Sequence, residues 1–399
     1  MTSRRRYPFL IAVLALLAGL ASLPASASAS PPTPFAYVTN ANGLTGNSVS
    51  VISTATNAVV ATVPVGLTPL DAAVTPDGAF VYVANLGSDN VSVINTATNA
   101  VVATVPVGDG PMGIAITPNG TRAYVVNEAA GSVSVIDTTT NAVSATVPVG
   151  DFPAAVAVTP GGQFVYVGHA FSSPTDDSVT VIATATNTVV GSVSLHDSLG
   201  GMAIAPNGTA YASGLHSESL SVIDTATNTV ADTVTVGESP LGVAATPDSS
   251  AVYVVNAWNN DVSVIAAATN SVVDTVPVGE SPKDVAVSPD GSLAYVSNGD
   301  SDNVSVISTA SNTVIATVPV GAQPWGVAMT PPIADQPADP LEPNSPQNPS
   351  PPPASITPVP AKQTGPKKRH RCRKGFKKRK VHGKARCVRI KKTTKRKGR

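Results

Sequence analysis

Basic residues are almost missing from the long central part of the sequence. Between Phe35 and Thr330 the only ones are Arg122 and Lys283, against 22 acidic residues, so this region carries a charge of −20. Residues 362–399 hold 20 Lys or Arg and no acid, and the net charge of zero hides this polarity. A region so poor in cations has few groups to hold a phosphate, which disfavours phosphorylated substrates.

Cysteine is also scarce, since the chain has only Cys372 and Cys387, both close to its end. The central region therefore has no thiol for nucleophilic catalysis, metal ligation or cross-linking. If the protein is exported, the pair is expected to form a disulfide that closes a 16-residue loop. Two free thiols in a disordered tail are the alternative.

The longest apolar run, Phe9–Leu20, is too short to cross a bilayer. Three arginines precede it at 4–6, and small residues follow at 25–29, a pattern typical of a secretory signal peptide over residues 1–29. We therefore expect an extracellular or cell-envelope protein without a transmembrane segment. Whether export uses the general or the twin-arginine route stays open.

The sequence contains seven repeats, each marked by one tyrosine. The spacings are 45, 42, 42, 45, 42 and 42 residues between Tyr37, Tyr82, Tyr124, Tyr166, Tyr211, Tyr253 and Tyr295. A period of this length with several short β-branched runs is typical of a β-propeller blade. The prediction is an all-β fold over residues 30–330, a seven-bladed β-propeller of four-stranded antiparallel blades.

One repeat, residues 242–279, shows four strands a to d separated by turn residues. The a strands are rich in small residues and suit the crowded axis, whereas the d strands end in Pro-Val-Gly, and proline fits an outer edge. The domain starts with a b strand at Phe35 and ends with an a strand over 326–330. We therefore predict that the last a strand completes the first blade and closes the ring.

The repeats resemble the YVTN β-propeller family of exported and surface proteins. The motif stands as Tyr37-Val-Thr-Asn40, with variants such as Tyr82-Val-Ala-Asn85 and Tyr295-Val-Ser-Asn298. The resemblance implies a surface-layer-like propeller and no shared reaction. The fourth and fifth repeats depart from the pattern, with His169 and Gly214 in place of the asparagine. They are either a degenerate stretch or a place where a ligand is held.

In such blades the b–c and d–a loops share one face, and here they vary between repeats while the opposite turns do not. This pattern indicates a binding face, although solvent-exposed loops also drift freely. The candidate binding residues on this face are Met112, Phe152, His169, Phe171, His216, Trp258, Lys283 and Trp325.

Catalytic constellations are scarce in the sequence. His169, His196 and His216 lie in neighbouring repeats with acidic residues nearby, and a metal site there is conceivable, but loop histidines are more often solvated. We therefore assign no metal, no cofactor and no catalytic residue. A lactonase acting on a phosphosugar would need cations, and only Lys283 is suitably placed. No serine nucleophile can be singled out without a paired base.

The C-terminal part differs in composition. Residues 331–366 contain 13 prolines and are expected to form an extended linker, and residues 367–399 form a basic two-cysteine tail. The segment around Val381–Lys384 is expected to form a small hairpin. The tail should bind polyanions such as cell-wall polymers, lipid headgroups or extracellular DNA. The polyanion-binding candidates are Lys367, Lys368, Arg369, Arg371, Arg373, Lys374, Lys377, Lys378, Arg379 and Lys380.

Two functional hypotheses follow. The main one is a non-enzymatic exported scaffold, most simply a monomer, that binds a protein or glycan through its propeller face and is tethered by its tail. The alternative is a propeller enzyme, or a protein that binds a small ligand or metal, at the loop face of blades four and five. Lactonase-like or other hydrolase activity is left open by the second hypothesis.

Overall fold

The computed structural model describes residues 34–43, 46–170, 178–195, 197–331, 376–381 and 384–389. The chain divides into two units, residues 1–339 and 340–399. The expected signal peptide, the linker and the start of the basic tail lie outside the described residues. Among the described residues no helix is long and apolar enough to cross a membrane.

Seven antiparallel sheets of four strands make up the first unit, and we call them blades 1 to 7 in chain order. Blades 1 to 4 are β28(Pro324–Met329)-β1(Phe35–Asn40)-β2(Ser48–Ser53)-β3(Ala58–Pro64), β4(Pro69–Val74)-β5(Phe80–Asn85)-β6(Asn90–Asn95)-β7(Ala100–Pro106), β8(Pro111–Ile116)-β9(Arg122–Asn127)-β10(Ser132–Asp137)-β11(Ala142–Pro148) and β12(Pro153–Val158)-β13(Phe164–His169)-β14(Ser178–Ala183)-β15(Thr188–Ser194). Blades 5 to 7 are β16(Leu199–Ile204)-β17(Thr209–Gly214)-β18(Ser219–Asp224)-β19(Thr229–Thr235), β20(Pro240–Ala245)-β21(Ala251–Asn256)-β22(Asp261–Ala266)-β23(Ser271–Pro277) and β24(Pro282–Val287)-β25(Leu293–Asn298)-β26(Asn303–Ser308)-β27(Thr313–Pro319). A short 3₁₀ turn, η1(Leu86–Ser88), follows β5.

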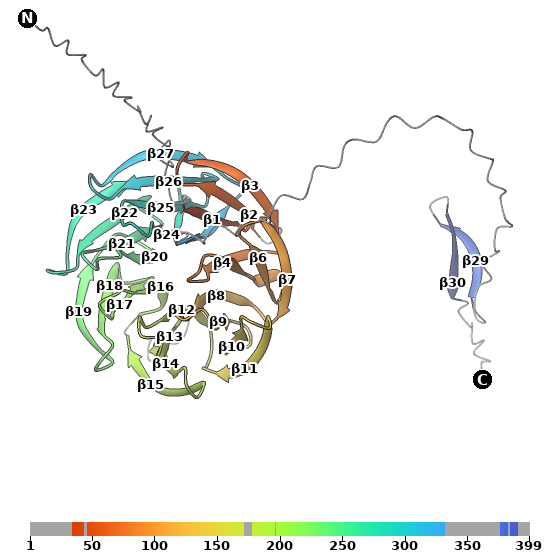
Figure 1. Ribbon diagram of the computed structural model, residues 1–399, viewed down its shortest axis with the longest axis horizontal. Helices are drawn as coiled ribbons and strands as arrows, with labels where there is room; N and C mark the ends of the chain where they lie inside the picture. Colours follow the sequence, from red (N-terminus) through yellow and green to blue (C-terminus); the bar gives the residue numbers. More distant parts are fainter. Residues whose placement is uncertain are drawn as a thin grey trace, which may run out of the picture. The chain divides into compact units, whose positions relative to one another are not determined.

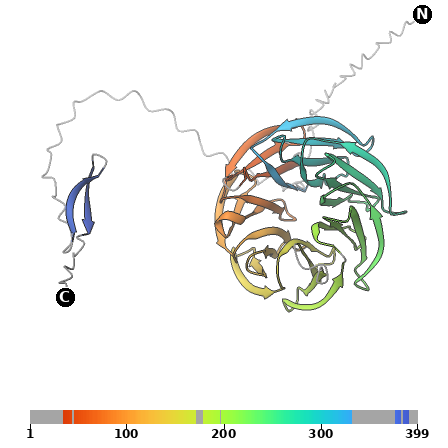
Figure 2. The ribbon, with the colours of Figure 1, turned by 180° about the vertical axis from the view of Figure 1, so that it is seen from behind.

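The blades surround a common axis, and the first strand of each blade lies innermost (Figures 1 and 2). The predicted seven-bladed propeller is thus confirmed. Its ring closes as expected, because β28 pairs antiparallel with β1 and places Val327 opposite Val38. The amide of Phe35 also donates to the hydroxyl of Thr330 at 2.8 Å, which ties the two ends of the domain together.

The repeated tyrosine explains how neighbouring blades adhere. Each of the seven is buried in its blade, and six of them donate a side-chain hydrogen bond to an asparagine in the turn before the outer strand of the next blade. Tyr295 of blade 7 makes this bond at 2.9 Å to Asn57, which lies in the N-terminal part of blade 1. Tyrosine suits this position because it combines a large apolar ring with a polar tip.

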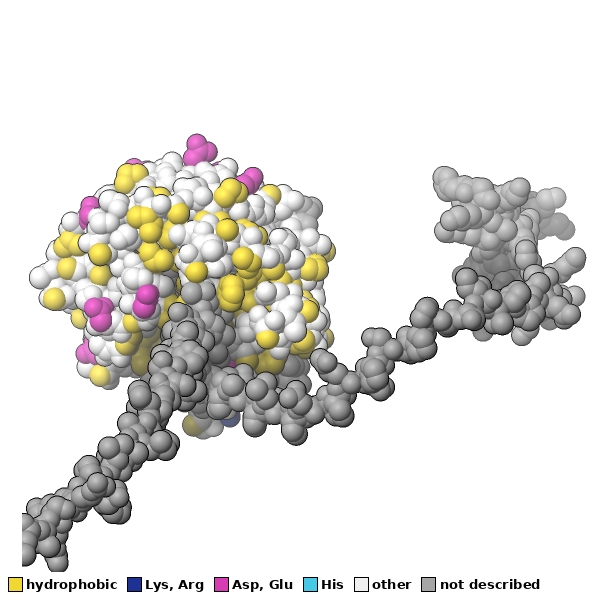
Figure 3. All heavy atoms as spheres, turned by 45° about the horizontal axis from the view of Figure 1, so that its top comes forward, with side chains coloured by type: hydrophobic (Ala, Val, Ile, Leu, Met, Phe, Trp, Pro, Cys, Tyr) yellow, Lys and Arg dark blue, Asp and Glu magenta, His cyan; other side chains and the backbone are white. Residues whose placement is uncertain are grey.

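The hydrophobic core is divided among the junctions between blades. One cluster, for example, joins Tyr37 and Val51 of blade 1 to Val83 and Ile94 of blade 2. The outer strands leave isolated apolar side chains exposed, and these are scattered among polar and acidic groups in the view of Figure 3. Each blade is therefore stabilised largely by contact with its two neighbours.

The second unit contains a two-stranded antiparallel hairpin, β29(Phe376–Val381) with β30(Lys384–Arg389). It forms where the sequence predicts one. Four of the expected polyanion-binding residues, Lys377, Lys378, Arg379 and Lys380, are on β29, and the other six lie outside the described residues. Cys387 is on β30, but Cys372 is not described, so the disulfide stays a prediction.

Candidate active site

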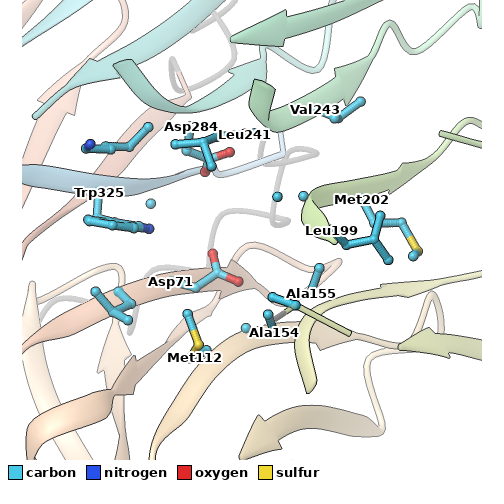
Figure 4. A pocket seen from close by; sticks show the side chains of 18 of the residues that line it. Asp71, Met112, Ala154, Ala155, Leu199, Met202, Leu241, Val243, Asp284 and Trp325 are labelled. Carbon is cyan, nitrogen blue, oxygen red and sulfur yellow. The ribbon is translucent and has the colours of Figure 1, made fainter. Parts of the chain in front are cut away.

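A cavity of about 460 Å³ lies on the propeller axis. Its wall is built from the second to fourth residues of the inner strands, together with Leu199 at the start of β16 and with Ala170 and Leu215 from two loops. Small residues at many of these positions leave the axis open, as the glycines of β8, β16, β20 and β28 show. Figure 4 shows the side chains that project into it.

Two aspartates of equivalent repeat position face this cavity. Asp71 is the third residue of β4 in blade 2, and Asp284 is the third residue of β24 in blade 7. Both flank blade 1, so ring closure brings them to the same side of the axis. In Figure 4 the carboxyl groups point toward each other across the cavity.

Each carboxyl group is held by amide hydrogens. Asp71 accepts from the amide of Ile114 in the next blade at 2.9 Å, and Asp284 accepts in the same way from Val327 at 2.9 Å. The next residue along β4 also donates to Asp71, at 2.7 Å. These bonds fix the orientation of both groups, as a reaction centre requires.

Glycines in the preceding blades make room for the two aspartates. A Cβ atom at Gly242 would lie 2.4 Å from a carboxylate oxygen of Asp284, and one at Gly326 would lie 2.9 Å from the Cα of Asp71. Any larger residue would push the acids out of place. The positions of the two aspartates therefore depend on glycine at these two places.

Burial raises the pKa of Asp71 from 3.8 to about 7, and the charge of Asp284 adds to this rise, while the amides of Ile114 and Ala72 oppose it. Burial likewise raises the pKa of Asp284 to about 6, against the amides of Val327 and Val285. Each side chain is partly exposed within the channel, but the surrounding strands keep it from bulk water. Both carboxyls therefore keep their protons to a higher pH than an exposed aspartate does.

Trp325 of β28 lies between the strands that carry the two acids and points its ring into the cavity (Figure 4). The ammonium group of Lys283 lies 5.2 Å from the centre of that ring and donates to the hydroxyl of Ser281 at 2.6 Å. Burial lowers the pKa of Lys283, and the charge of Asp300 opposes this change. The remaining wall is apolar and includes Met112, Leu199, Met202, Leu241 and Val243.

A largely apolar cavity with two carboxyl groups of raised pKa can supply a general acid and a general base together. Groups of three or more metal ligands are not found among the described residues. The arrangement is therefore suited to proton transfer on a small, mainly apolar molecule.

Comparisons with known proteins agree with an enzyme-like propeller. Residues 37–209 and 208–316 match the model of the family described as "Lactonase, 7-bladed beta-propeller". The chain belongs to this family. No curated protein matches the sequence.

Solved structures share the fold. Hydrazine synthase of Kuenenia stuttgartiensis has a TM-score of 0.62 at 26% identity, over 71% of this chain and 97% of that one. A functionally unknown protein from Desulfotomaculum acetoxidans has a TM-score of 0.66 at 19% identity, over 75% and 99% of the two chains. The dihydro-heme d1 dehydrogenase NirN, in complex with DHE, has a TM-score of 0.57 at 16% identity, over 77% and 78%.

The family match corrects the main functional hypothesis. A non-enzymatic scaffold was expected because the repeat motif contains no catalytic residue. The matched family, however, is a lactonase family, and hydrazine synthase, to which this chain is 26% identical, is by its name an enzyme. The alternative, a propeller enzyme or small-ligand protein, fits better. Its location at the loop face of blades 4 and 5 stays a prediction, and the two acids of the central cavity lie on blades 2 and 7.

The predicted binding residues separate into two groups. Met112, Lys283 and Trp325 line the central cavity. Phe152 and Trp258 are exposed on loops, with 77% of Trp258 accessible to solvent. Phe171, like His196, lies outside the described residues.

His169 is not at the loop surface where the repeat comparison places it. It is the last residue of β13 and is buried, with Nδ1 2.8 Å from the carbonyl oxygen of Asp151 and Nε2 2.9 Å from the hydroxyl of Thr180. It occupies the position that asparagine holds in other blades, so both ring nitrogens serve the structure. His216 is exposed and lies 3.5 Å from the carboxylate of Asp197.

The two aspartates were missed by the sequence analysis. The predicted binding residues near the axis, such as Lys283 and Trp325, directly follow the proline that opens the inner strand. The two acids are one residue further along their strands. A signal existed, because the other blades have only glycine or alanine in this column, for example Gly113 and Ala155. A charge in a column of small inner-strand residues indicates a site.

The raised pKa values predict an unusual pH dependence of stability. Below about pH 4 both carboxyls are protonated in the folded and the unfolded chain, so burial costs nothing. As pH rises toward 7 the unfolded chain releases these protons first, and the free energy of unfolding therefore falls. For Asp71 a shift from 3.8 to about 7 corresponds to roughly 4 kcal/mol. We expect about half of this because the side chain is partly exposed within the channel.

Asp71→Asn should therefore raise the melting temperature at about pH 8 by several degrees and change it little at about pH 4. Thermal unfolding of both proteins at the two pH values measures this. Asp274→Asn, at an exposed carboxyl on β23, is the control that should show neither effect. A wild type that melts above Asp71→Asn at the higher pH would contradict the assignment.

Proposed function

We propose that the central cavity is the active site of a hydrolase that opens small, uncharged lactones. The observation that carries the proposal is the pair Asp71 and Asp284, two carboxyl groups that face an otherwise largely apolar cavity and whose pKa values are raised by burial. The family description supports the reaction class. Hydrazine synthase, by its name an enzyme, supports a catalytic role for this kind of propeller.

The acid pair can carry out the reaction without changing its total protonation. The ionised carboxylate takes a proton from water as the water oxygen bonds to the lactone carbonyl carbon. The protonated carboxyl donates its proton to the ring oxygen as the acyl C–O bond breaks. The product is a hydroxy acid, and the single proton of the pair has moved from one aspartate to the other.

The substrate class follows from the wall of the cavity. Two carboxyl groups repel an anion, and Lys283 already donates to Ser281 and lies beside Trp325. A phosphorylated sugar lactone would lack a cationic partner here. A neutral ring with apolar substituents would instead contact Met112, Leu199 and the indole of Trp325.

The test is lactone opening by the full-length protein, followed by acid release in a pH-stat. The panel should contain neutral γ- and δ-lactones of increasing alkyl length, together with 6-phosphogluconolactone as the anionic member. We expect turnover of neutral lactones and little or none of the phosphorylated one. Preference for the phosphorylated member would contradict the substrate class, and inertness toward the whole panel would overturn the reaction.

We further propose that this propeller is an exported protein of the surface-layer-like YVTN type, with a basic tail that holds anionic envelope polymers. Support comes from the repeat motif, from the N-terminal pattern of residues 1–29 and from the charge of the tail. In the hairpin, β29 and β30 together carry seven Lys or Arg in twelve residues. Such a charge density binds polyanions chiefly through release of counterions.

Removal of residues 362–399 should abolish retention of the protein on isolated anionic cell walls at low salt. Binding of the full-length chain should fall steeply as salt rises, since each neutralised anionic group releases a counterion. Sedimentation with cell walls across a salt series measures this, and the truncated protein should retain its lactone-opening activity. Equal retention of the two proteins would contradict the role of the tail.

A further inference from the structure

In most blades the last residue of the second strand has a buried side chain that lies against the end of the previous blade. We call the place that this side chain fills the slot. In five blades this residue is an asparagine whose side-chain amide donates to a serine of the neighbouring strand at 2.9–3.0 Å; the pairs are Asn40–Ser50, Asn85–Ser92, Asn127–Ser134, Asn256–Ser263 and Asn298–Ser305. In blade 4, His169 fills the slot and contacts Thr180. The slot therefore normally buries a satisfied hydroxyl group.

Blade 5 lacks this filler, because Gly214 stands at the position. A side chain cannot be restored simply, since a Cβ atom at Gly214 would lie 2.5 Å from both a carboxylate oxygen of Asp197 and the hydroxyl of Ser217. Asp197 accepts from the amides of His216 at 3.1 Å and Ser217 at 2.8 Å. The polar groups of this junction are thus arranged differently from those of the others.

The loss of the asparagine leaves Ser221 without a side-chain partner. Ser221 corresponds to Ser263 of blade 6, which is 3% exposed and bonded to Asn256. Ser221 is instead partly exposed, and no hydrogen bond of its hydroxyl is found among the described residues. A free hydroxyl where the repeat otherwise buries a satisfied one indicates that something else can bond there.

A cleft of about 740 Å³ opens at this place between blades 4 and 5. Its floor is one face of the blade 5 sheet, where Ser219 pairs with Thr235 and Ser221 with Thr233, so that four hydroxyl groups stand in two rows. Val230 of β19 forms the exposed part of an apolar wall, and Val193 and Leu195 of blade 4 are buried beneath it. The lining includes residues of the outer strands β15 and β19.

We propose that this cleft is a second binding site, separate from the axial cavity, and that its ligand is a neutral saccharide. Sugars present hydroxyl groups on their edges and C–H groups on their faces, which match the rows of Ser and Thr hydroxyls and the apolar wall. The carboxylate of Asp197 adds an acceptor for a sugar hydroxyl. The volume is that of an ordinary small-molecule site.

The charge of the described lining excludes an acidic sugar. It contains the carboxylate of Asp197 and neither Lys nor Arg. His216, with a side chain 65% exposed beside Asp197, lies where it can contact a ligand that extends beyond the cleft. The cleft and the axial cavity share Leu199, but the cleft contains neither Asp71 nor Asp284, so this proposal does not depend on lactone hydrolysis.

The test is titration of the full-length protein with glucose, maltose and N-acetylglucosamine, with gluconate as the anionic comparison, by calorimetry and saturation-transfer NMR. At least one neutral sugar should bind, and gluconate should not. Ser221→Ala should weaken that binding about tenfold, the effect of one lost hydrogen bond. Its melting temperature should stay close to that of the wild type.

Ser263→Ala is the matched control, because it removes the equivalent serine in a filled slot. It should lower the melting temperature and leave sugar affinity within twofold of the wild type. Absence of binding by all neutral sugars at ~10 mM would overturn the proposal. Binding that survives Ser221→Ala but is lost in Asp71→Asn would place the sugar in the axial cavity and overturn it as well.

Discussion

Asp71→Asn and Asp284→Asn should each lower the rate of lactone opening by a factor of about 10² to 10⁴. Each substitution removes one member of a pair that must supply an acid and a base in the same step. Asparagine is nearly isosteric and its oxygen can still accept the amide hydrogens of Ile114 or Val327, so the strands should keep their places. Initial rates at saturating and at low lactone concentration separate effects on kcat from effects on KM.

The double variant should be hardly slower than either single variant, because the two groups act as a unit. Asp274→Asn, at an exposed site, should keep full activity. Losses that simply multiply in the double variant would argue that the acids do not share a reaction step.

The pH profile gives an independent check on the pair. The wild type should show a bell-shaped dependence of kcat/KM with limbs at about 6 and about 7, the pKa values of the two carboxyls. Activity falls at low pH because the base becomes protonated, and at high pH because the acid loses its proton. Either single variant should lose the bell shape, since only one titrating carboxyl remains.

Deletion of residues 324–330 should open the ring and remove the cooperative unfolding transition of the native propeller. The deleted strand β28 pairs with β1, seats Thr330 against Phe35 and packs beside β4 and β24. Its loss should cost a large share of the roughly 5–15 kcal/mol that stabilises an ordinary domain. Calorimetry or circular dichroism on heating measures the transition.

The matched control removes the same number of residues, 332–338, just after this strand. That protein should melt like the wild type. If the β28 deletion left the melting curve unchanged, closure of the ring by this strand would not be a source of stability.

The architecture could be predicted in detail because each repeat shows the same order of strand and turn residues. The seven tyrosines predicted seven blades, and the small residues predicted which strand of each blade is innermost. The types of the first and last strands predicted how the ring closes. The comparison of repeats is strong evidence of fold, because a strand or turn that is ambiguous in one repeat can be assigned from the others.

The candidate site was not predictable to the same degree. The meeting of Asp71 and Asp284 depends on blades 2 and 7 both flanking blade 1, which follows only from the closed ring. His169 was misplaced for the opposite reason, since a histidine in a degenerate repeat attracts attention as a ligand although it replaces a structural asparagine. Ser221 gives no sequence signal, because it matches the repeat, and only the missing partner at Gly214 makes it free.

The hydrogen bond from Tyr295 to Asn57 is of the same kind as those that join blades linked by the chain itself. The chain connects blade 7 only to β28 of blade 1, so this bond ties blade 7 to the N-terminal strands of the same blade. With Phe35 and Thr330 in contact, a short peptide would span the native ends, and the break could be moved to another turn. The same ring could therefore be built by a chain that begins at another turn.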